Sequence, residues 1–486
     1  MDNFLDKGGF LVLIESPTEK KIYPLFLGIE SIKDPFGFEA LFKGVNALIK
    51  EVFGGDMKME NVPVYSFLQF PFYEYGLTKE EVHCLFEEEF YNASSGKIKE
   101  YLFKKHLLSL KQGKRYIYPN NIVGAVVRGD NFYNREEFIE GLWEKLKTEN
   151  IFLSAPRRFG KTSCMYYLYD HPKPAWQTLH LELQHIHHPK GFVAEMIARF
   201  CTQEKNRGFE EIIEMYNPSG MDNLSLKMQI EEMVKDNTWQ KMGEDFLGKL
   251  LERIPNHSYF LLLFDEFIYM MENFKKEEAS SFAEWFFEQR KKNKLRFLIA
   301  SSVCLNQYLK SHSLDRFFND FIEVKIPPLS KDEALRFIDE LLLSKKIRIK
   351  DEVKEEVFNL VGQGVPYFIQ MLLCEVKEKI TPEEIKRIYQ EKILGPDYKQ
   401  YFFYFFQRLQ SHPYIFLAGL LKRLSLEDKV SESQLFEWYK EYSGKEDKED
   451  FREILTYLSD EFYVEKDNEG KYSFFCKILK DWWRRQ

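Results

Sequence analysis

The chain has 486 residues, 44% of them hydrophobic and 16% aromatic, so it can fill the two or three hydrophobic cores that its length predicts. Its formal net charge of -8 gives no overall attraction to nucleic acid or to an anionic membrane. Six scattered cysteines, the lack of a leader pattern and the lack of an apolar run of membrane-spanning length favour a reduced, cytoplasmic protein.

Residues 1–120 form a domain of their own, in which the apolar run 9–14 predicts a buried strand. The helical spacing of apolar residues over 38–53 predicts a helix, so we expect a small α/β or α+β fold. The phrase from Leu11 to Pro17 resembles the opening of Toprim nuclease domains, in which a strand-end glutamate serves metal-dependent chemistry. That family also needs a D-x-D pair, and none occurs before residue 125, so a solvated Glu15 is favoured over a nuclease.

Strands and helices alternate over 121–328, the next predicted domain. An amphipathic helix carries Ile139, Leu142, Trp143 and Leu146, and strand-like apolar runs follow at 151–153, 177–183, 258–264, 296–300 and 321–326. Strands separated by helices predict a parallel sheet covered on both faces.

A phosphate-binding loop joins the first of these strands to a helix. The form G-x-x-x-x-G-K-[ST] directs loop amides at phosphates, while its lysine reaches the β and γ oxygens and its hydroxyl binds Mg²⁺. The predicted site for ATP and Mg²⁺ comprises Ala155 in place of the first glycine, then Pro156, Arg157, Arg158, Phe159, Gly160, Lys161, Thr162 and Ser163. Arg157 and Arg158 reach phosphate or a neighbouring subunit in one interpretation and are a solvated pair in the other.

Polar residues end two later strands. Asp265 and Glu266 follow the strand at 258–264, where Asp265 is expected to hold the metal through water and Glu266 to polarise the attacking water. Ser301 or Ser302, after the strand at 296–300, is expected to sense the γ-phosphate. The four histidines between 180 and 188 are dispersed by strand alternation and a bend, which argues against a metal site.

Helices dominate 329–398, a predicted helical lid, and 399–486 has the order of a winged helix, three helices followed by two strands. Thr381 and Glu384 have the spacing of a capping box. Residues 401–486 hold 14 basic and 16 acidic residues, where a DNA-binding module usually has a basic stripe. Protein contact or autoinhibitory packing is therefore favoured over DNA. The terminal tryptophans either close the core or contact a phosphate backbone.

Five segments together resemble the archaeal/bacterial ATPase family of the STAND class, relatives of AAA+ and origin-recognition proteins. They are Phe132–Glu137, Ala155–Ser163, Asp265–Glu266, the turn Gly364-Val-Pro366, and 473–485. The resemblance covers about residues 121–486 and implies that Phe132 and Arg135 lie near the base and that Pro366 contacts the nucleotide from the lid. Asn134 stands where that family usually has glycine. Arg316 occupies a position from which AAA+ relatives project an arginine finger.

Three functions follow from these features. The first is a slow, regulated ATPase that acts as a switch, suited to bacterial stress or antiviral defence, with a protein partner or self-association. The second is an initiator-like protein that uses ATP to bind DNA. The third is an N-terminal nuclease effector governed by the ATPase.

Overall fold

The computed structural model describes residues 9–15, 22–28, 64–70 and 117–486, the last range without 156–157, 236–237, 302–303, 348, 378–379 and 411–415. The chain forms two compact units. The first contains Met1–Asn121, Asp332–Phe358 and Gln370–Gln390, and the second contains Ile122–Lys331, Asn359–Ile369 and Glu391–Gln486. The boundaries predicted at 120, 328 and 398 remain predictions. None of the helices in the described ranges combines the length and the apolar character needed to cross a bilayer.

The first unit contains a three-stranded antiparallel sheet. Its middle strand β1 (Gly9–Glu15) pairs with β2 (Ile22–Gly28) and β3 (Val64–Phe70), which confirms the strand predicted at 9–14. The predicted helix at 38–53 lies outside the described residues. The lid helices are α15 (Lys331–Ser344), α16 (Asp351–Val361), α17 (Pro366–Cys374) and α18 (Pro382–Ile388); α15, α16 and α17 have residues in both units. The capping box at Thr381 and Glu384 is confirmed, because each backbone N–H donates to the other side chain, at 2.8 and 3.3 Å.

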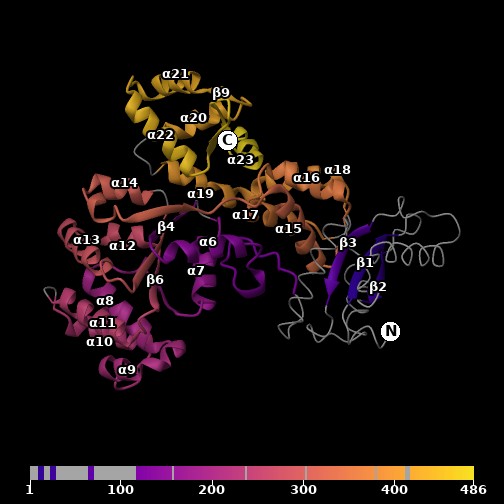
Figure 1. The fold of residues 1–486 in the computed structure, drawn as a ribbon. Helices are drawn as coiled ribbons and strands as arrows, with labels where there is room; N and C mark the ends of the chain where they lie inside the picture. The colour runs from indigo at the N-terminus through magenta and orange to yellow at the C-terminus, as the bar shows by residue number, and fades with distance from the viewer. Residues whose placement is uncertain are drawn as a thin grey trace. The chain divides into compact units, whose positions relative to one another are not determined.

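The second unit is built on a five-stranded parallel sheet of order β5-β6-β7-β4-β8. Figure 1 labels two of these strands, β4 and β6. These are β4 (Asn150–Ser154), β5 (Trp176–Glu182), β6 (Tyr259–Asp265), β7 (Leu295–Ser301) and β8 (Phe321–Lys325). β4, the strand before the phosphate loop, thus lies inside the sheet with β7 between it and β6. The predicted P-loop α/β fold, with a parallel sheet, a helical lid and a winged helix, is confirmed.

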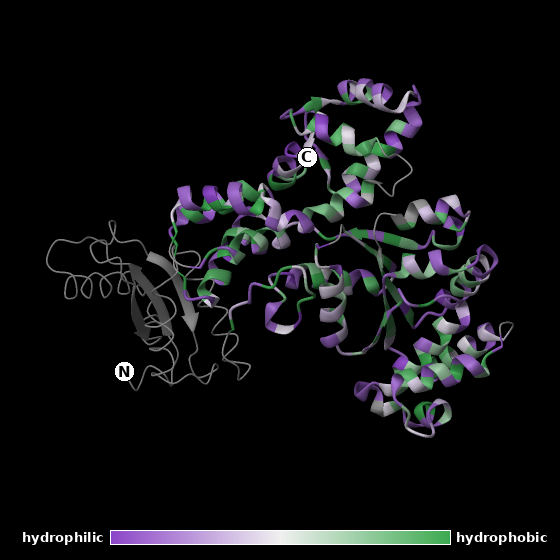
Figure 2. Ribbon diagram, turned by 180° about the vertical axis from the view of Figure 1, so that it is seen from behind, coloured by the Kyte–Doolittle hydropathy of each residue, from purple (hydrophilic) through white to green (hydrophobic). Residues whose placement is uncertain are grey.

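Helices cover both faces of this sheet because its inner strands are apolar on both sides. One face packs on α6 (Glu136–Leu146) and α7 (Lys161–Asp170), and the other packs on the hydrophobic cluster that the helices between β5 and β8 supply. Figure 2 shows the hydrophobic colour along these strands and the polar colour on the outer helix surfaces. The remaining elements are η5 (Gly129–Asn131), α8 (Pro189–Thr202), η6 (Glu204–Phe209), α9 (Glu210–Tyr216), α10 (Asn223–Met233), α11 (Trp239–Arg253), α12 (Phe267–Asn273), α13 (Lys276–Arg290), α14 (Cys304–Ser311) and η7 (Asp315–Phe317).

The C-terminal module is a winged helix. After η8 (Tyr389–Ile393), η9 (Pro396–Tyr398) and α19 (Lys399–Gln410) come α20 (Leu417–Leu424), β9 (Val430–Ser431), α21 (Glu432–Ser443), α22 (Lys448–Asp460), β10 (Val464–Lys466), β11 (Lys471–Phe474) and α23 (Lys477–Arg484). Trp482 and Trp483 on α23 are 2% and 1% exposed, so the tryptophans close the core of this module. β10 begins at Val464, two residues after Phe462, whose positive φ of 55° is not a strand conformation.

Candidate nucleotide-binding site

The described part of the loop between β4 and α7 ends on a glycine in the left-handed region. Gly160 has a φ of 89° and precedes Lys161, the first residue of α7. Ala155 is not among the described residues with positive φ, so its methyl group costs no backbone strain where the motif has glycine. The first-turn amides and the positive dipole end of α7 face the loop, as an anion requires. Pro156 and Arg157 lie outside the described residues.

The first turn of α7 carries the predicted cation and hydroxyls. Nζ of Lys161 donates to the carbonyl oxygen of Ala155, so the ammonium lies across its own loop. The half-buried Thr162 follows it and is the hydroxyl that suits Mg²⁺. Ser163 is buried, and its Oγ accepts a hydrogen bond from the backbone N–H of Val127 at 3.1 Å. Ser163 therefore holds the segment before α6 against α7.

Asp265 and Glu266 lie at the carboxyl edge of the sheet, where the loop also begins. Asp265 ends β6, is 6% exposed, and accepts a hydrogen bond from the backbone N–H of Glu266 at 3.0 Å. Glu266 has a φ of 55°, which is unusual for a residue with a side chain and is frequent at functional sites. Ser301 ends β7 in register with Ser154, between the loop strand and β6, and Ser302 lies outside the described residues.

The residues predicted to lie near the base pack on α7. Phe132 stacks on Tyr167 with 4.6 Å between ring centroids. Arg135 is 8% exposed and lies near Cys164; burial raises the pKa of that thiol to about 12, and Arg135 partly opposes the rise. Asn134 has a φ of 46°, a conformation in which asparagine is the side chain most readily tolerated after glycine. The departure from the resembled family thus still permits a left-handed turn here.

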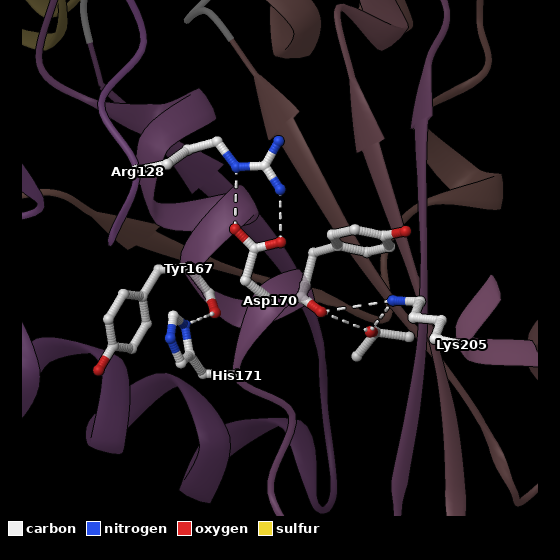
Figure 3. Close-up of polar contacts among 7 residues, drawn as sticks. Arg128, Tyr167, Asp170, His171 and Lys205 are labelled. Atoms are coloured by element: carbon white, nitrogen blue, oxygen red, sulfur yellow. Dashed lines mark hydrogen bonds and ion pairs between the residues drawn. The ribbon is translucent and has the colours of Figure 1, made fainter. Parts of the chain in front are cut away.

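Figure 3 shows polar contacts at the C-terminal end of α7 that sequence reasoning missed. Arg128 binds Asp170 through two hydrogen bonds, of 2.9 and 2.5 Å. Nδ1 of His171 lies 3.2 Å from the carbonyl of Tyr167. Lys205, whose pKa burial lowers to about 7, donates to Thr178 Oγ1 at 2.8 Å. Basic side chains at this end complement the helix dipole and hold α7 in place.

The lid turn meets the phosphate loop through Arg158. Its guanidinium donates to the carbonyl of Gly124 and lies 5.3 Å from the ring centre of Tyr367, the residue after Pro366. The Leu329 N–H donates to the Gly364 carbonyl at 2.7 Å, in an approach too close for a side chain at Gly364. Arg158 is exposed, and it makes both contacts within its own chain; the roles predicted for it on phosphate or on a neighbouring subunit remain predictions.

The next loop residue, Phe159, contacts the winged helix. It is 5% exposed and stacks on Phe462 with 4.9 Å between ring centroids, and its ring lies 6.4 Å from that of Phe475. Phe462 and Phe475 meet edge to face at 4.6 Å. The phosphate loop thus inserts an aromatic ring into a pair that comes from the C-terminal module.

Arg316 lies at the other edge of the sheet. It is exposed on η7, just before β8, and the following Asp320 binds Asn150 at the start of β4 at 3.1 Å. Lys325 at the far end of β8 pairs with Ser154, beside the loop. Arg316 therefore does not lie with its own Lys161.

The predicted dispersal of the histidines is visible in their contacts. His185 lies 3.5 Å from the buried carboxylate of Glu195. His188 caps α8 through the Gly191 N–H and lies 3.0 Å from Glu231.

Comparison with known proteins identifies the fold. No protein-family model and no curated protein matches the chain. The Walker-type ATPase PABY2304 of Pyrococcus abyssi matches with a TM-score of 0.54 and 15% identity over 75% of this chain and 99% of its own. The ORC2 protein of Aeropyrum pernix, in its ADPNP–ADP complexes, matches with a TM-score of 0.43 and 11% identity over 76% and 96%. The RuvB Holliday junction branch migration motor of Thermotoga maritima matches with a TM-score of 0.34 and 12% identity, over 71% of this chain and 93% of its own. The chain has the fold of a Walker-type ATPase.

Proposed function

We propose that this protein is a STAND-like switch that binds ATP with Mg²⁺, hydrolyses it slowly and changes the position of its winged helix with the nucleotide. Lys161 and the loop amides bind the β and γ phosphates. Thr162 and Asp265 hold the metal, since hydroxyl and carboxylate oxygens are the donors that Mg²⁺ prefers. Glu266 polarises the attacking water, and Phe132, Arg135 and Pro366 contact the nucleoside.

The observation that carries the switch is the contact of Phe159 with Phe462. Phe159 belongs to the loop that must wrap the phosphates, while Phe462 belongs to the module that would move. Phosphate binding draws Lys161 away from the Ala155 carbonyl, and the loop residues between them must adjust. The stack on Phe462 then differs between empty and filled loops, which is the differential contact that a ligand-driven shift requires.

Two further contacts join the winged helix to the same unit. Asp460, at the end of α22, forms a 2.6 Å ion pair with Lys325, at the end of β8. Glu465 on β10 accepts a hydrogen bond of 3.3 Å from Gln363 in the lid turn. Each is polar and accessible to water, and such contacts contribute about 1 kcal/mol or less. Weak polar contacts around an aromatic stack suit an interface that opens reversibly.

The test is amide hydrogen exchange of residues 464–474, together with ATP binding measured on the same samples. We expect ATP to change exchange in this hairpin in the wild-type chain and to change nothing in Lys161→Ala. If the wild type binds ATP without any change in amide exchange of residues 464–474, the protein is a static nucleotide-binding scaffold and the proposed switch is wrong. No ATP binding by the wild type would overturn the whole proposal.

A further inference from the structure

Two neighbouring strands place a second carboxylate beside Asp265. Glu182 ends β5 and pairs in parallel register with Asp265 at the end of β6. Paired residues of neighbouring strands have their side chains on the same face, so both carboxylates lie on one side of the sheet. Adjacent strands are about 4.8 Å apart, which brings both within reach of one hydrated ion.

That side of the sheet is the one that α7 covers. Tyr166 of α7 lies over His180, two residues before Glu182, with 4.5 Å between ring centroids. The Thr178 hydroxyl, on the same face of β5, donates to a carbonyl of α7 at 3.2 Å. The alternate residues Leu179 and Leu181 belong to the hydrophobic core on the other side. Glu182 therefore faces the helix that Lys161 and Thr162 begin.

Among the described residues, no hydrogen bond or ion pair engages the exposed Glu182 carboxylate. It nevertheless lies close to the site. Burial raises the pKa of Tyr166, and the charges of Glu182 and Asp265 raise it further, because each disfavours a neighbouring phenolate. Tyr166, Glu182 and Asp265 thus form one group at the carboxyl edge.

Basic side chains around this pair have partners of their own. His180 is 7% exposed, and its Nε2 has no hydrogen-bond partner among the described residues. Arg128 lies 4.3 Å from the Tyr166 ring centre but binds Asp170. Arg199 pairs with Glu195 at 3.3 Å. Two adjacent carboxylates repel each other, and a divalent cation would offset the repulsion.

We propose that Glu182 is a positioning residue for the nucleotide-bound Mg²⁺: with Asp265 it holds water molecules of the ion's hydration shell. The inference rests on the proposed function. Mg²⁺ keeps several waters and is held by one or two carboxylates besides the phosphates, which is the number that Asp265 and Glu182 supply. Glu182 in this way orients the metal and the triphosphate relative to Glu266.

The opposite edge strand offers a matched control. Glu323 on β8 is exposed, lies on an edge strand of the same sheet and is paired with Phe152 of β4 rather than with a carboxylate. Glu182→Gln and Glu323→Gln remove the same charge from comparable positions. The measurement is the affinity of the full chain for a fluorescent ATP analogue, with Mg²⁺ and with EDTA.

Mg²⁺ should increase the affinity for the analogue about tenfold less in Glu182→Gln than in wild type. A tenfold loss is typical when an outer-shell partner of a metal is removed. In EDTA the same variant should bind the analogue as well as or better than wild type, because a negative charge beside the triphosphate has been removed. Glu323→Gln should match the wild type in both conditions.

Two results would overturn the inference while leaving the proposed function standing. One is a Mg²⁺-dependent gain in Glu182→Gln equal to that of Glu323→Gln. The other is an equal loss of affinity with Mg²⁺ and with EDTA, which would indicate a purely structural role. A wild-type chain that binds no analogue in either condition overturns the proposed function itself.

Discussion

The backbone nitrogen of Lys477, the first residue of α23, lies against Gly362 at a distance that a Cβ atom could not tolerate. Gly362 also has a φ of 89°, so glycine is required there for two reasons. The residue follows α16 and precedes the turn that leads to Pro366. The winged helix therefore packs directly on the backbone of the lid turn.

Gly362→Ala should separate these two reasons when it is compared with Gly444→Ala. Gly444 has a φ of 70° with nothing near its Cβ position, so its substitution should cost only the backbone strain of about 1 kcal/mol. Gly362→Ala adds the overlap with Lys477 and should lower the free energy of unfolding further. Urea denaturation measures the free energy of unfolding of both variants. An equal loss in the two would mean that Lys477 moves away from residue 362 without a measurable energetic cost.

Lys161→Ala should abolish ATP binding, because the ammonium is the main point charge on the triphosphate. Glu266→Gln should bind ATP yet hydrolyse it poorly, because the amide cannot take a proton from water. Equilibrium binding and phosphate release distinguish the two variants. Equal ATP affinity in wild type and Lys161→Ala would refute the assignment of the site.

Phe159→Leu keeps an apolar side chain but removes the aromatic stack on Phe462. Such a stack contributes about 0.5–1.5 kcal/mol beyond its buried area, so the opening equilibrium should shift by about 2- to 10-fold. Without nucleotide, amide exchange of 464–474 should shift toward the rate seen with ATP. Phe403→Leu, at an exposed position of α19, is the control and should change nothing.

Pro366→Ala keeps the cradle of Gly160, Lys161 and Thr162 but loosens the first turn of α17. ATP affinity should stay within about tenfold, roughly 1.4 kcal/mol. The conformational response should weaken, because the proposed switch needs Pro366 to fix the turn on the nucleotide. Limited proteolysis near 327–330 and 395–400, with and without ATP, measures this response, and an unchanged wild-type pattern would exclude coupling through the lid.

His180→Phe should reduce the loss in free energy of unfolding that the wild type shows as the pH falls from about 6.5 to about 4. The folded-state pKa of about 4 lies below the usual 6.5, so the unfolded chain binds more protons between these values and stability falls as pH drops. The full effect is about 3 kcal/mol. Near pH 7 the variant should be as stable as wild type or more so, because Nε2 has no partner to lose. The measurement is the melting temperature of wild type and of His180→Phe between pH 4 and pH 7. The same dependence on pH in both proteins would refute the role given to His180.

The elements that sequence patterns predict best are those with a strong local signal. The apolar runs before Ala155 and Asp265 predict β4 and β6, because a buried parallel strand has few polar residues. The last helix, α23, was not predicted, because its eight residues between the wing and the chain end give too short a pattern.

The parts of the candidate site that the sequence did not predict depend on contacts between residues far apart in the chain. Glu182 lies beside Asp265 because of the register of β5 on β6, and no local pattern of the sequence encodes that register. Arg158 and Phe159 are adjacent, yet one contacts Tyr367 and the other Phe462, more than 200 residues away. Only the strand order could have pointed to Glu182, because the topology of the sheet determines which residue lies beside Asp265, the residue that we propose holds the metal.

The position of Arg316 restricts the symmetry of any assembly that uses it. Lys161 lies at the carboxyl edge of the sheet and Arg316 near the amino edge, so the donor and the acceptor of an arginine finger are different surface patches. A two-fold dimer joins identical patches and would not bring them together unless both met at one axis. Copies that share Arg316 would instead join head to tail, and such contacts close into a ring or continue as a filament.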